Sequence, residues 1–320
     1  MGRQVRTAST ASSRTRRRVP AGPSSRAKEN VSCSSASTGA TSQTSAKGNC
    51  SAIQPGNRLA CRNESEAHVK TFLRVAAIYD IHGNLPALEA VLHDVRQAGV
   101  DRVVVGGDVV PGPMPRETIA QLRNLDISAE FIQGNGEVAV LEQMAGREPR
   151  AVPEQFQPII RWTAGQLGFE HQRWLASWPK TLRLMILGLG DVFFCHATPR
   201  DEKECFTRLT SEERVLPVFA GLDLTVVVCG HTHMQFDRTI GATRVVNAGS
   251  VGMPFGEPGA YWALLGPNVE LRRTGYDLAR AAERIRGTKY PQAQEFAARN
   301  VLEPPSEREM LEVFTRVEVH

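Results

Sequence analysis

From Val69 onward, hydrophobic residues follow two alternating patterns along the chain. Short apolar runs rich in β-branched residues predict buried strands, because such side chains pack well on a pleated surface. We predict buried strands at Leu73–Tyr79, Arg102–Val105, Ala129–Gln133, Val192–Cys195 and Leu224–Cys229. A further run, Leu182–Leu187, is expected to pair with Val192–Cys195 in a hairpin, because only a short glycine-containing segment separates the two.

Amphipathic segments separate these strands and predict helices. The first of them repeats its leucines and valines every three or four residues, and Gly99 follows as a typical C-cap. We predict helices at Leu85–Ala98, Pro115–Leu125, residues 137–178, Ser211–Ala220 and residues 276–315. Within the last of these, Ser306 and Glu309 have the spacing of a capping box, which marks a helix start.

Three shorter runs, Phe236–Ile240, Thr243–Val246 and Tyr261–Leu265, predict antiparallel strands around glycine-rich loops. Many strands that alternate with helices are typical of an α/β protein with helices on both faces of its sheets. We therefore expect a layered sandwich. Residues 69–275 would form its main domain, and residues 276–320 a helical extension of that domain.

The net charge of +4 conceals two unlike regions. Residues 1–68 hold eleven Lys or Arg and three Glu, whereas residues 69–320 hold 27 basic and 31 acidic side chains. The first region has few large apolar residues, so we predict a disordered basic tail. Its run Arg14–Arg18 is typical of a targeting or nucleic-acid segment, although a tail without a role is favoured, and translation could begin at Val69. The mildly acidic body gives no indication of nucleic-acid binding.

The six cysteines show neither a disulfide framework nor metal-type CxxC spacing, which favours a reducing compartment. No apolar run approaches the length of a membrane helix, and the N-terminus lacks the apolar segment of a signal peptide. We therefore expect a soluble, cytoplasmic protein that does not bind membranes. The pattern predicts no particular oligomeric state.

Metal-binding side chains follow five of the predicted strands, directly after each strand ends. They are Asp80, His82, Asp108, Asn135, His196, His231 and His233. The carboxyl ends of strands in an open α/β sheet form the edge at which ligands bind. One aspartate at a strand end is often only a helix cap, but donors after five strands in succession rarely arise by chance. We predict that the seven side chains form one site.

Seven donors exceed the four or so ligands of one zinc ion. They suit two divalent ions that share a carboxylate, an arrangement that polarises phosphoryl oxygens and holds a hydroxide for attack. Mixed carboxylate and imidazole ligands are compatible with Mn, Fe, Zn or Ni, and we take Mn as the first choice. The expected substrate is a small phosphate ester.

The motifs Asp80-x-His82, Gly107-Asp108, Gly134-Asn135, His196 and Gly230-His231-x-His233 resemble, in the same order, those of the calcineurin-like metallophosphoesterases. The resemblance covers about residues 72–273 and implies a four-layer αββα sandwich of mixed sheets. It implies one metal on Asp80, His82, Asp108 and His233. It implies a second metal on Asp108, Asn135, His196 and His231. Asp108 and a nucleophilic hydroxide would bridge the metals, so Asp108, Asn135 and His196 are the predicted catalytic residues.

Gly136 departs from the family pattern. Most members of the family have a histidine there, which contacts the phosphate and can protonate the leaving group. A smaller bacterial and archaeal branch also lacks it and has an Asn-x-Gly-Ser sequence like Asn247–Ser250. The resemblance is closest to that branch and implies a phosphodiesterase. Glu137 and the C-terminal helical segment are the places where a replacement acid is expected.

Two alternatives stay open. The protein could be a phosphomonoesterase that acts on a nucleotide or phosphoprotein, or a metal-binding interaction scaffold, as one retromer subunit of the same branch is. Ser250 lies in a sequence like a nucleophile elbow, but only His320 follows it, which disfavours a serine hydrolase. Arg200 and Ser250 are candidate substrate contacts, with a solvated loop residue the equal alternative for Arg200.

Overall fold

The structure is a computed structural model that describes residues 70–150 and 152–319. The predictions for residues 1–68, including the Arg14–Arg18 run, and for a start at Val69 lie outside the described residues. Within the described ranges, no helix is both long and apolar enough to span a membrane.

Two mixed β-sheets form the centre of the described chain. The six-stranded sheet has the order β1 (Thr71–Phe72), β5 (Thr181–Ile186), β6 (Gly190–Cys195), β7 (Val226–Cys229), β9 (Thr243–Asn247) and β8 (Phe236–Ile240). The five-stranded sheet has the order β11 (Val269–Thr274), β10 (Ala260–Leu265), β2 (Val75–Ile78), β3 (Arg102–Val105) and β4 (Ala129–Phe131). The strands that deliver the predicted donors run parallel in each sheet, as β2-β3-β4 and β6-β7.

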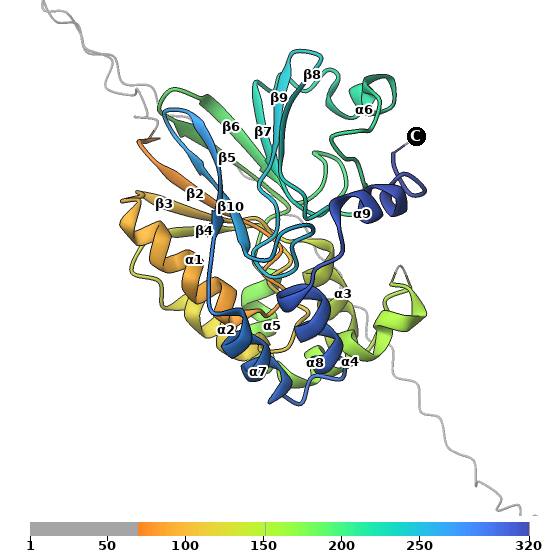
Figure 1. The fold of residues 1–320 in the computed structure, drawn as a ribbon. Helices are drawn as coiled ribbons and strands as arrows, with labels where there is room; N and C mark the ends of the chain where they lie inside the picture. The colour runs from red at the N-terminus through yellow and green to blue at the C-terminus, as the bar shows by residue number, and fades with distance from the viewer. Residues whose placement is uncertain (1–69, 151, 320) are drawn as a thin grey trace, which may run out of the picture. The chain divides into compact units, whose positions relative to one another are not determined.

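Helices cover the outer face of each sheet (Figure 1). On β2, Ala76 and Ile78 point outward into a core shared with α1 (Leu85–Gln97) and α2 (Pro115–Arg123). The intervening Val75 and Ala77 point inward into the core between the two sheets, as the two-residue period of a strand requires. On the other side, α6 (Glu212–Phe219) packs over the six-stranded sheet. The predicted four-layer αββα sandwich is therefore confirmed.

The predicted strand Leu73–Tyr79 is present as β2 (Val75–Ile78), and the short strand β1 immediately before it was not predicted. Thr71–Phe72 pairs with β5 in one sheet, whereas Val75–Ile78 pairs with β3 and β10 in the other. At the break, the N–H groups of Leu73 and Arg74 donate to the Asp101 carboxylate at 2.6 and 2.9 Å. Thr71–Phe72 is too short to be predicted as a strand of its own, so the apolar pattern does not reveal this change of sheet.

The predicted helical region 137–178 is divided into several helices. They are α3 (Asn135–Met144), a 3₁₀ turn (Glu154–Phe156), α4 (Gln157–Gln166) and α5 (Phe169–Ala176). Gly146, with a φ of 73°, follows the end of α3, and Pro149 and Pro153 occupy the connection. The other elements predicted before residue 275 begin and end within two residues of the predicted positions.

The C-terminal region is also divided rather than continuous. It contains α7 (Leu278–Arg286), α8 (Ala293–Phe296), a π-helical segment (Ala297–Leu302) and α9 (Glu307–Phe314). The Ser306 hydroxyl accepts the Glu309 N–H at 3.2 Å, which confirms Ser306 as the N-cap of α9. The edge strand β11 was not predicted, because its side chains are mostly exposed and show no apolar alternation.

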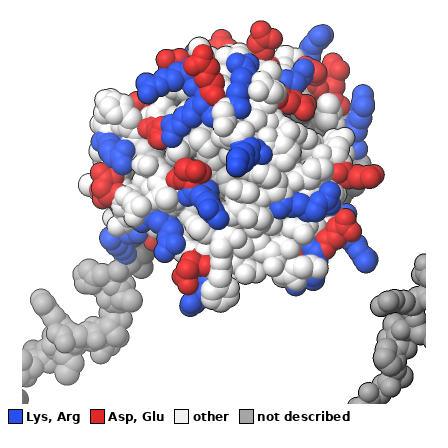
Figure 2. Space-filling model, turned by 90° about the horizontal axis from the view of Figure 1, so that it is seen from below, with Lys and Arg blue, Asp and Glu red and all other residues white. Residues whose placement is uncertain are grey.

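The charged side chains of the body do not segregate by sign on the face shown in Figure 2. Lys and Arg lie interspersed with Asp and Glu on that face (Figure 2). Several are paired within the described chain, as in the 2.6 Å contact between Arg284 and Glu89. Such a mixed surface lacks the single-sign field that attracts a polyanion.

Candidate metal centre

The structure brings the strand-end donors together at one edge of the sandwich. Asp80 and His82 follow β2, Asp108 follows β3, Asn135 begins α3 after β4, His196 follows β6, and His231 and His233 follow β7. The five-stranded sheet therefore supplies the carboxylates, one histidine and the amide, and the six-stranded sheet supplies the other three histidines. The site exists only because the two sheets end at the same place.

The first group of ligand-type side chains consists of Asp80, His82 and His233, whose donor atoms lie within 4.8 Å of one another. His233 Nε2 lies 3.3 Å from Asp80 Oδ1 and 3.3 Å from His82 Nε2. Asp80 and His82 are buried, and the side chain of His233 is only 10% exposed. Phe255 stacks on the His233 ring at a centroid distance of 5.3 Å, which holds that imidazole in place.

The second group consists of Asp80, Asp108 and His196 within the same 4.8 Å limit. His196 Nε2 lies 3.5 Å from Asp108 Oδ1 and 3.8 Å from Asp80 Oδ1. The Asn135 side-chain oxygen is 3.1 Å from the same nitrogen. His231 lies beside the group, with its ring centroid 5.1 Å from that of His196.

Asp108 faces both groups with different oxygens. Its Oδ2 lies 3.6 Å from His82 Nε2, and its Oδ1 lies 3.5 Å from His196 Nε2. Asp80 also touches both groups, but with a single oxygen, because the His231 backbone N–H donates to its Oδ2 at 2.9 Å. One carboxylate with an oxygen directed to each group is the arrangement that a bridging ligand needs.

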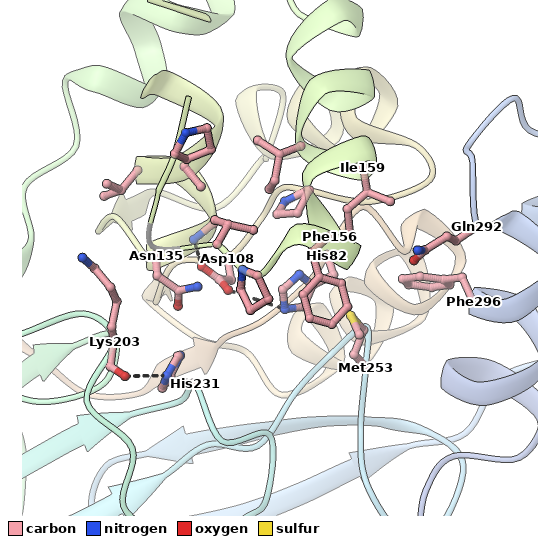
Figure 3. Close-up of a pocket in the computed structure, with 18 of the residues that line it drawn as sticks. His82, Asp108, Asn135, Phe156, Ile159, Lys203, His231, Met253, Gln292 and Phe296 are labelled. Carbon is pink, nitrogen blue, oxygen red and sulfur yellow. Dashed lines mark hydrogen bonds and ion pairs between the residues drawn. The ribbon is translucent and has the colours of Figure 1, made fainter. Parts of the chain in front are cut away.

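Three of the histidines donate one ring N–H to a backbone carbonyl. His196 Nδ1 donates to Gly106 at 2.9 Å, and His233 Nδ1 donates to Met253 at 2.7 Å. His231 Nε2 lies 3.2 Å from the Lys203 carbonyl (Figure 3). A carbonyl can only accept, so in the neutral form of each histidine the proton lies on the nitrogen next to the carbonyl, and the second ring nitrogen is the one that can bind a metal.

These donors fit a pair of divalent cations. Asp80 Oδ1 is buried and accepts no hydrogen bond, an arrangement that is costly unless a cation satisfies it. The two Nε2 atoms of His82 and His233 face each other at 3.3 Å, where two lone pairs would repel unless a proton or a metal lay between them. Carboxylate, amide and imidazole donors together are compatible with first-row transition metals.

The backbone at the site is strained in a way that is rare elsewhere in the molecule. Six non-glycine residues of the described chain have positive φ, and five of them are predicted ligands: Asp80, His82, Asp108, His231 and His233. Each such conformation costs on the order of 1–3 kcal/mol and persists only where surrounding contacts enforce it. The positive φ values therefore lower the stability of the fold, and they direct these five side chains toward the site.

Burial and the neighbouring charges act in opposite directions on the aspartate. Burial raises the pKa of Asp80, but His233, His196 and His82 outweigh it and hold the pKa well below its usual range. The carboxylate therefore stays ionised in the protein interior. A buried anion whose Oδ1 accepts no hydrogen bond attracts a cation to this position.

The histidines respond differently to the same surroundings. Burial opposes protonation of all four, and it lowers the pKa of His231 to about 4 and that of His82 below its usual value. In His196 and His233 the effect of burial is exceeded by the nearby aspartates, mainly Asp108 for His196 and Asp80 for His233, so their pKa values rise. His231 and His82 are therefore the imidazoles held most firmly in the neutral form that binds metals.

Glu137 was predicted as a place for a replacement acid, but its carboxylate is buried and anchors the ligand loops. It accepts the N–H groups of Asp108 and Gly134 at 2.8 Å and of Val110 at 3.1 Å. Burial and the charge of Asp108 raise its pKa to about 8, although the three backbone donors oppose the shift. Its side chain does not line the cavity described below, so it is a positioning residue rather than a proton donor to substrate.

Gly136, at the position of the missing histidine, lies against backbone. Its N–H donates to Asp108 Oδ1 at 2.7 Å. A Cβ atom added to Gly136 would lie 2.2 Å from the Val110 carbonyl oxygen and 2.9 Å from Asp108 Oδ1. The local backbone therefore leaves no room for any side chain there, and the glycine holds the bridging aspartate by its N–H.

Two predicted substrate contacts receive other roles. The Ser250 hydroxyl is fully buried, donates to the Asp80 carbonyl at 2.8 Å and accepts the Met253 N–H at 2.8 Å. Arg200 is exposed, pairs with Glu204 through Nε and Nη2, and does not line the cavity. Because Ser250 is buried and Arg200 lies outside the cavity, these contacts argue against substrate binding by either residue. Ser250 instead fixes the loop whose Met253 carbonyl orients His233.

A cavity of about 1300 Å³ opens from the ligands. His82, Asp108, Asn135 and His231 line one end of it, and Figure 3 shows these side chains together with Phe156, Ile159, Met253, Gln292 and Phe296. The C-terminal segment, from Tyr290 to Val317, contributes part of the wall. The C-terminal segment, one of the two places where a replacement acid was expected, therefore lines the same cavity as the metal ligands.

Sequence reasoning missed the residues that act through backbone atoms. The carbonyls of Gly106, Lys203 and Met253 orient three histidines, and no property of their side chains marks them for that task. It also missed Cys205, whose Sγ lies 3.4 Å from His231 Nε2 and which lines the cavity. A cysteine without metal-type spacing gives no local signal.

A family model agrees with this architecture. The model of the calcineurin-like phosphoesterase superfamily domain matches residues 73–267. An uncharacterized protein of Methanocaldococcus jannaschii is 29% identical over 239 residues, which cover 68% of this chain and 94% of that protein.

Two solved structures share the fold. The structure of a metallophosphoesterase from Sphaerobacter thermophilus is 28% identical with a TM-score of 0.53, and the match covers 71% of this chain and 99% of that one. A hypothetical protein from Pyrococcus horikoshii OT3 is 21% identical with a TM-score of 0.61, and the match covers 73% and 100% of the two chains.

Proposed function

Because this chain belongs to the calcineurin-like phosphoesterase superfamily, we propose that it is a metal-dependent phosphoric ester hydrolase that prefers phosphodiesters. The observation that carries the proposal is the buried Asp80 Oδ1, which accepts no hydrogen bond and belongs to both groups of ligand-type side chains, while His82 and Asp108 of these groups line the cavity. A scaffold protein has no need for strained ligand residues beside a cavity.

We assign one ion to Asp80, His82, Asp108 and His233, and the other to Asp108, Asn135, His196 and His231. Bound there, divalent ions would polarise a phosphoryl group and make water a better nucleophile. The chain supplies the positioning: backbone carbonyls orient three imidazoles, and the N–H of Gly136 holds Asp108. We take manganese as the first choice among the metals that this ligand set accepts.

The preference for diesters rests on Gly136. In most relatives a histidine at this position can protonate the leaving group, and general acid catalysis is typically worth about 10²–10⁴-fold in rate. Here the Val110 carbonyl closes that space, and Glu137 is engaged with three backbone donors. Esters whose leaving group departs without protonation should therefore be the better substrates.

A comparison of two nitrophenyl substrates tests the proposal. Metal-depleted protein would be reconstituted with Mn²⁺ and assayed on bis(4-nitrophenyl) phosphate and on 4-nitrophenyl phosphate. We expect turnover of the diester to exceed that of the monoester. Monoester preference would identify a phosphomonoesterase, and stoichiometric metal without turnover of either ester would identify a scaffold.

The variant Asp108→Asn tests the role of the proposed bridging carboxylate. It removes the negative charge, but the amide keeps the size of the side chain and an oxygen that can accept the Gly136 N–H. We expect diester turnover to fall at least about 100-fold, since loss of groups that merely orient metal ligands already costs about 10–100-fold. The exposed Asp126, which pairs with Arg96, provides the control Asp126→Asn. Equal loss in both variants would contradict the assignment of Asp108.

A small phosphate ester is the proposed partner. The mixture of charges on the face in Figure 2 supports a small molecule rather than a nucleic acid. Cys195, Cys205 and Cys229, the cysteines of the described chain, are free thiols, which supports the reducing, cytoplasmic environment that we propose.

A further inference from the structure

The cavity is much larger than a phosphoryl group requires. Its volume of about 1300 Å³ exceeds the roughly 300–1,000 Å³ of common ligand pockets. The metal ligands occupy only one end. Most of the remaining wall comes from residues 138–150, 152–160 and 290–317, which lie outside the ligand loops. Most of this space is therefore available to the part of a substrate that does not react.

The wall away from the ligands is largely apolar. Ile159, Ile160 and Phe296 are buried side chains that line it, and Figure 3 shows Ile159 and Phe296. Phe156 and Val313 line the same cavity with exposed fractions of 41% and 45%. Apolar side chains left open to water around a concave site mark a place for an apolar ligand group.

The charged residues of the wall do not form a polyanion site. Four cations line the cavity: Arg147, Arg150, Lys203 and Arg299. Three glutamates lie among them: Glu142, Glu148 and Glu295. Their near balance gives no strong positive field for a second or third phosphate. The apolar surface is thus the feature of this wall that can select a substrate.

We propose that the substrate is an amphiphilic phosphodiester, with its phosphoryl group at the metal ligands and a long alkyl or similar hydrocarbon group in the cavity. This inference rests on the proposed phosphodiesterase function. The hydrocarbon group is the ester that stays on phosphorus, because a long-chain alkoxide is a poor leaving group and Gly136 offers no acid to protonate it. Hydrolysis consumes one water, breaks the other P–O ester bond, and yields an alkyl phosphate and the second alcohol.

A series of methyl, butyl and octyl 4-nitrophenyl phosphates tests the proposal. The leaving group is the same throughout, so differences in kcat/KM report the alkyl group. Each methylene fully removed from water contributes about four-fold, or about 0.8 kcal/mol. With partial burial, we expect the Mn²⁺-loaded protein to hydrolyse the octyl ester at least about 30-fold better than the methyl ester, measured below the critical micelle concentration.

Two rim variants connect the selectivity to this wall. Phe156→Ser and Val313→Ser remove exposed apolar side chains, so the octyl-to-methyl ratio should fall at least about three-fold in each. Phe169→Ser is the matched control, because Phe169 is 67% exposed and lies outside the cavity. Its ratio should equal that of the wild type. Thermal unfolding of each variant would verify that it is folded.

The possible outcomes separate the inference from the function on which it rests. Equal turnover of the methyl and octyl esters would overturn the inference and leave the phosphodiesterase function intact. Faster hydrolysis of thymidine 5′-(4-nitrophenyl phosphate) than of the octyl ester would also overturn the inference. It would indicate that the substrate is a nucleotide ester. No turnover of any ester by metal-loaded protein would overturn both. If the octyl-to-methyl ratio were unchanged in Phe156→Ser and Val313→Ser, this wall would not be the cause of the preference for the octyl ester, and the inference would be wrong.

Discussion

The two ends of the cavity differ in how they are built. At the ligand end, short loops after five strands hold strained residues, and most of their polar atoms are engaged by backbone groups. At the opposite end, separate helical segments supply apolar side chains, several of them open to solvent. One end is specified locally at each strand terminus, and the other depends on how distant segments pack.

This difference implies different responses to mutation. Changes at the ligand end remove partners from buried polar groups, which is costly wherever water cannot replace them. Changes at the exposed rim remove contacts that are partly made to water already. We therefore expect large effects on stability and metal binding at the first end, and effects confined to substrate choice at the second.

The largest effect on stability is expected for Glu137→Ala. This change leaves the N–H groups of Asp108, Val110 and Gly134 without their acceptor. Since each unsatisfied buried group costs about 1–3 kcal/mol, the free energy of unfolding should fall by about 3–5 kcal/mol in urea titrations of metal-free protein. Glu142→Ala, on the same helix, should change it by less than about 0.5 kcal/mol. A similar small change for both variants would contradict the anchoring role of Glu137.

The next largest effect on stability is expected from metal binding. An ion that binds only the folded state at 100 times its Kd adds about 2.7 kcal/mol of stability. Mn²⁺ should therefore raise the Tm of the wild-type protein, and Asp80→Asn should abolish most of that rise. Asp223 also has positive φ but lies exposed, away from the ligands, so Asp223→Asn should respond to Mn²⁺ like the wild type. A full Mn²⁺ response in Asp80→Asn would exclude Asp80 as a ligand.

A smaller loss is expected for Gly136→Ala. The added methyl would meet the Val110 carbonyl at 2.2 Å, so the loop must shift, at a cost of about 1–3 kcal/mol. Gly165 is an exposed glycine within α4 with open space around its Cβ position. Gly165→Ala should therefore stabilise by about 0.4–1 kcal/mol. If both substitutions stabilised the protein, the account of crowding at Gly136 would be wrong.

The smallest effect is expected at the rim of the cavity. Val317 is 59% exposed and lines the apolar wall. Val317→Ser should change the free energy of unfolding by no more than about 0.5 kcal/mol, because little of its surface leaves water on folding. A loss near that of Glu137→Ala would show that the wall is part of the stabilising core, and would remove the contrast between the two ends.

The ligand end could be predicted from sequence because strand ends converge by geometry. A parallel strand places its last residue at the same edge as its neighbours, so donors after β2, β3, β4, β6 and β7 must approach one another. The wall could not be predicted, because Phe156 and Phe296 come together only through packing of segments that are 140 residues apart in the chain. The roles of the Lys203 and Met253 carbonyls were hidden for a related reason, since every residue has a carbonyl.

The break between β1 and β2 and the edge strand β11 were hidden by the limits of the apolar pattern. Strand β1 is only two residues long and is separated from β2 by Leu73 and Arg74, and β11 has almost no buried face. Gly136, by contrast, was recognised in the sequence, but its structural reason was not. Only the 2.2 Å approach to Val110 shows that the position has no room for a side chain.

The central claim is that the strand-end residues hold two divalent ions. Crystals grown with saturating Mn²⁺ and measured for anomalous scattering at the manganese edge test it directly. We predict two anomalous peaks, one among Asp80, His82 and His233 and one beside His196 and Asn135, with Asp108 touching both. Absence of both peaks, or peaks that lie away from these side chains, would contradict the account.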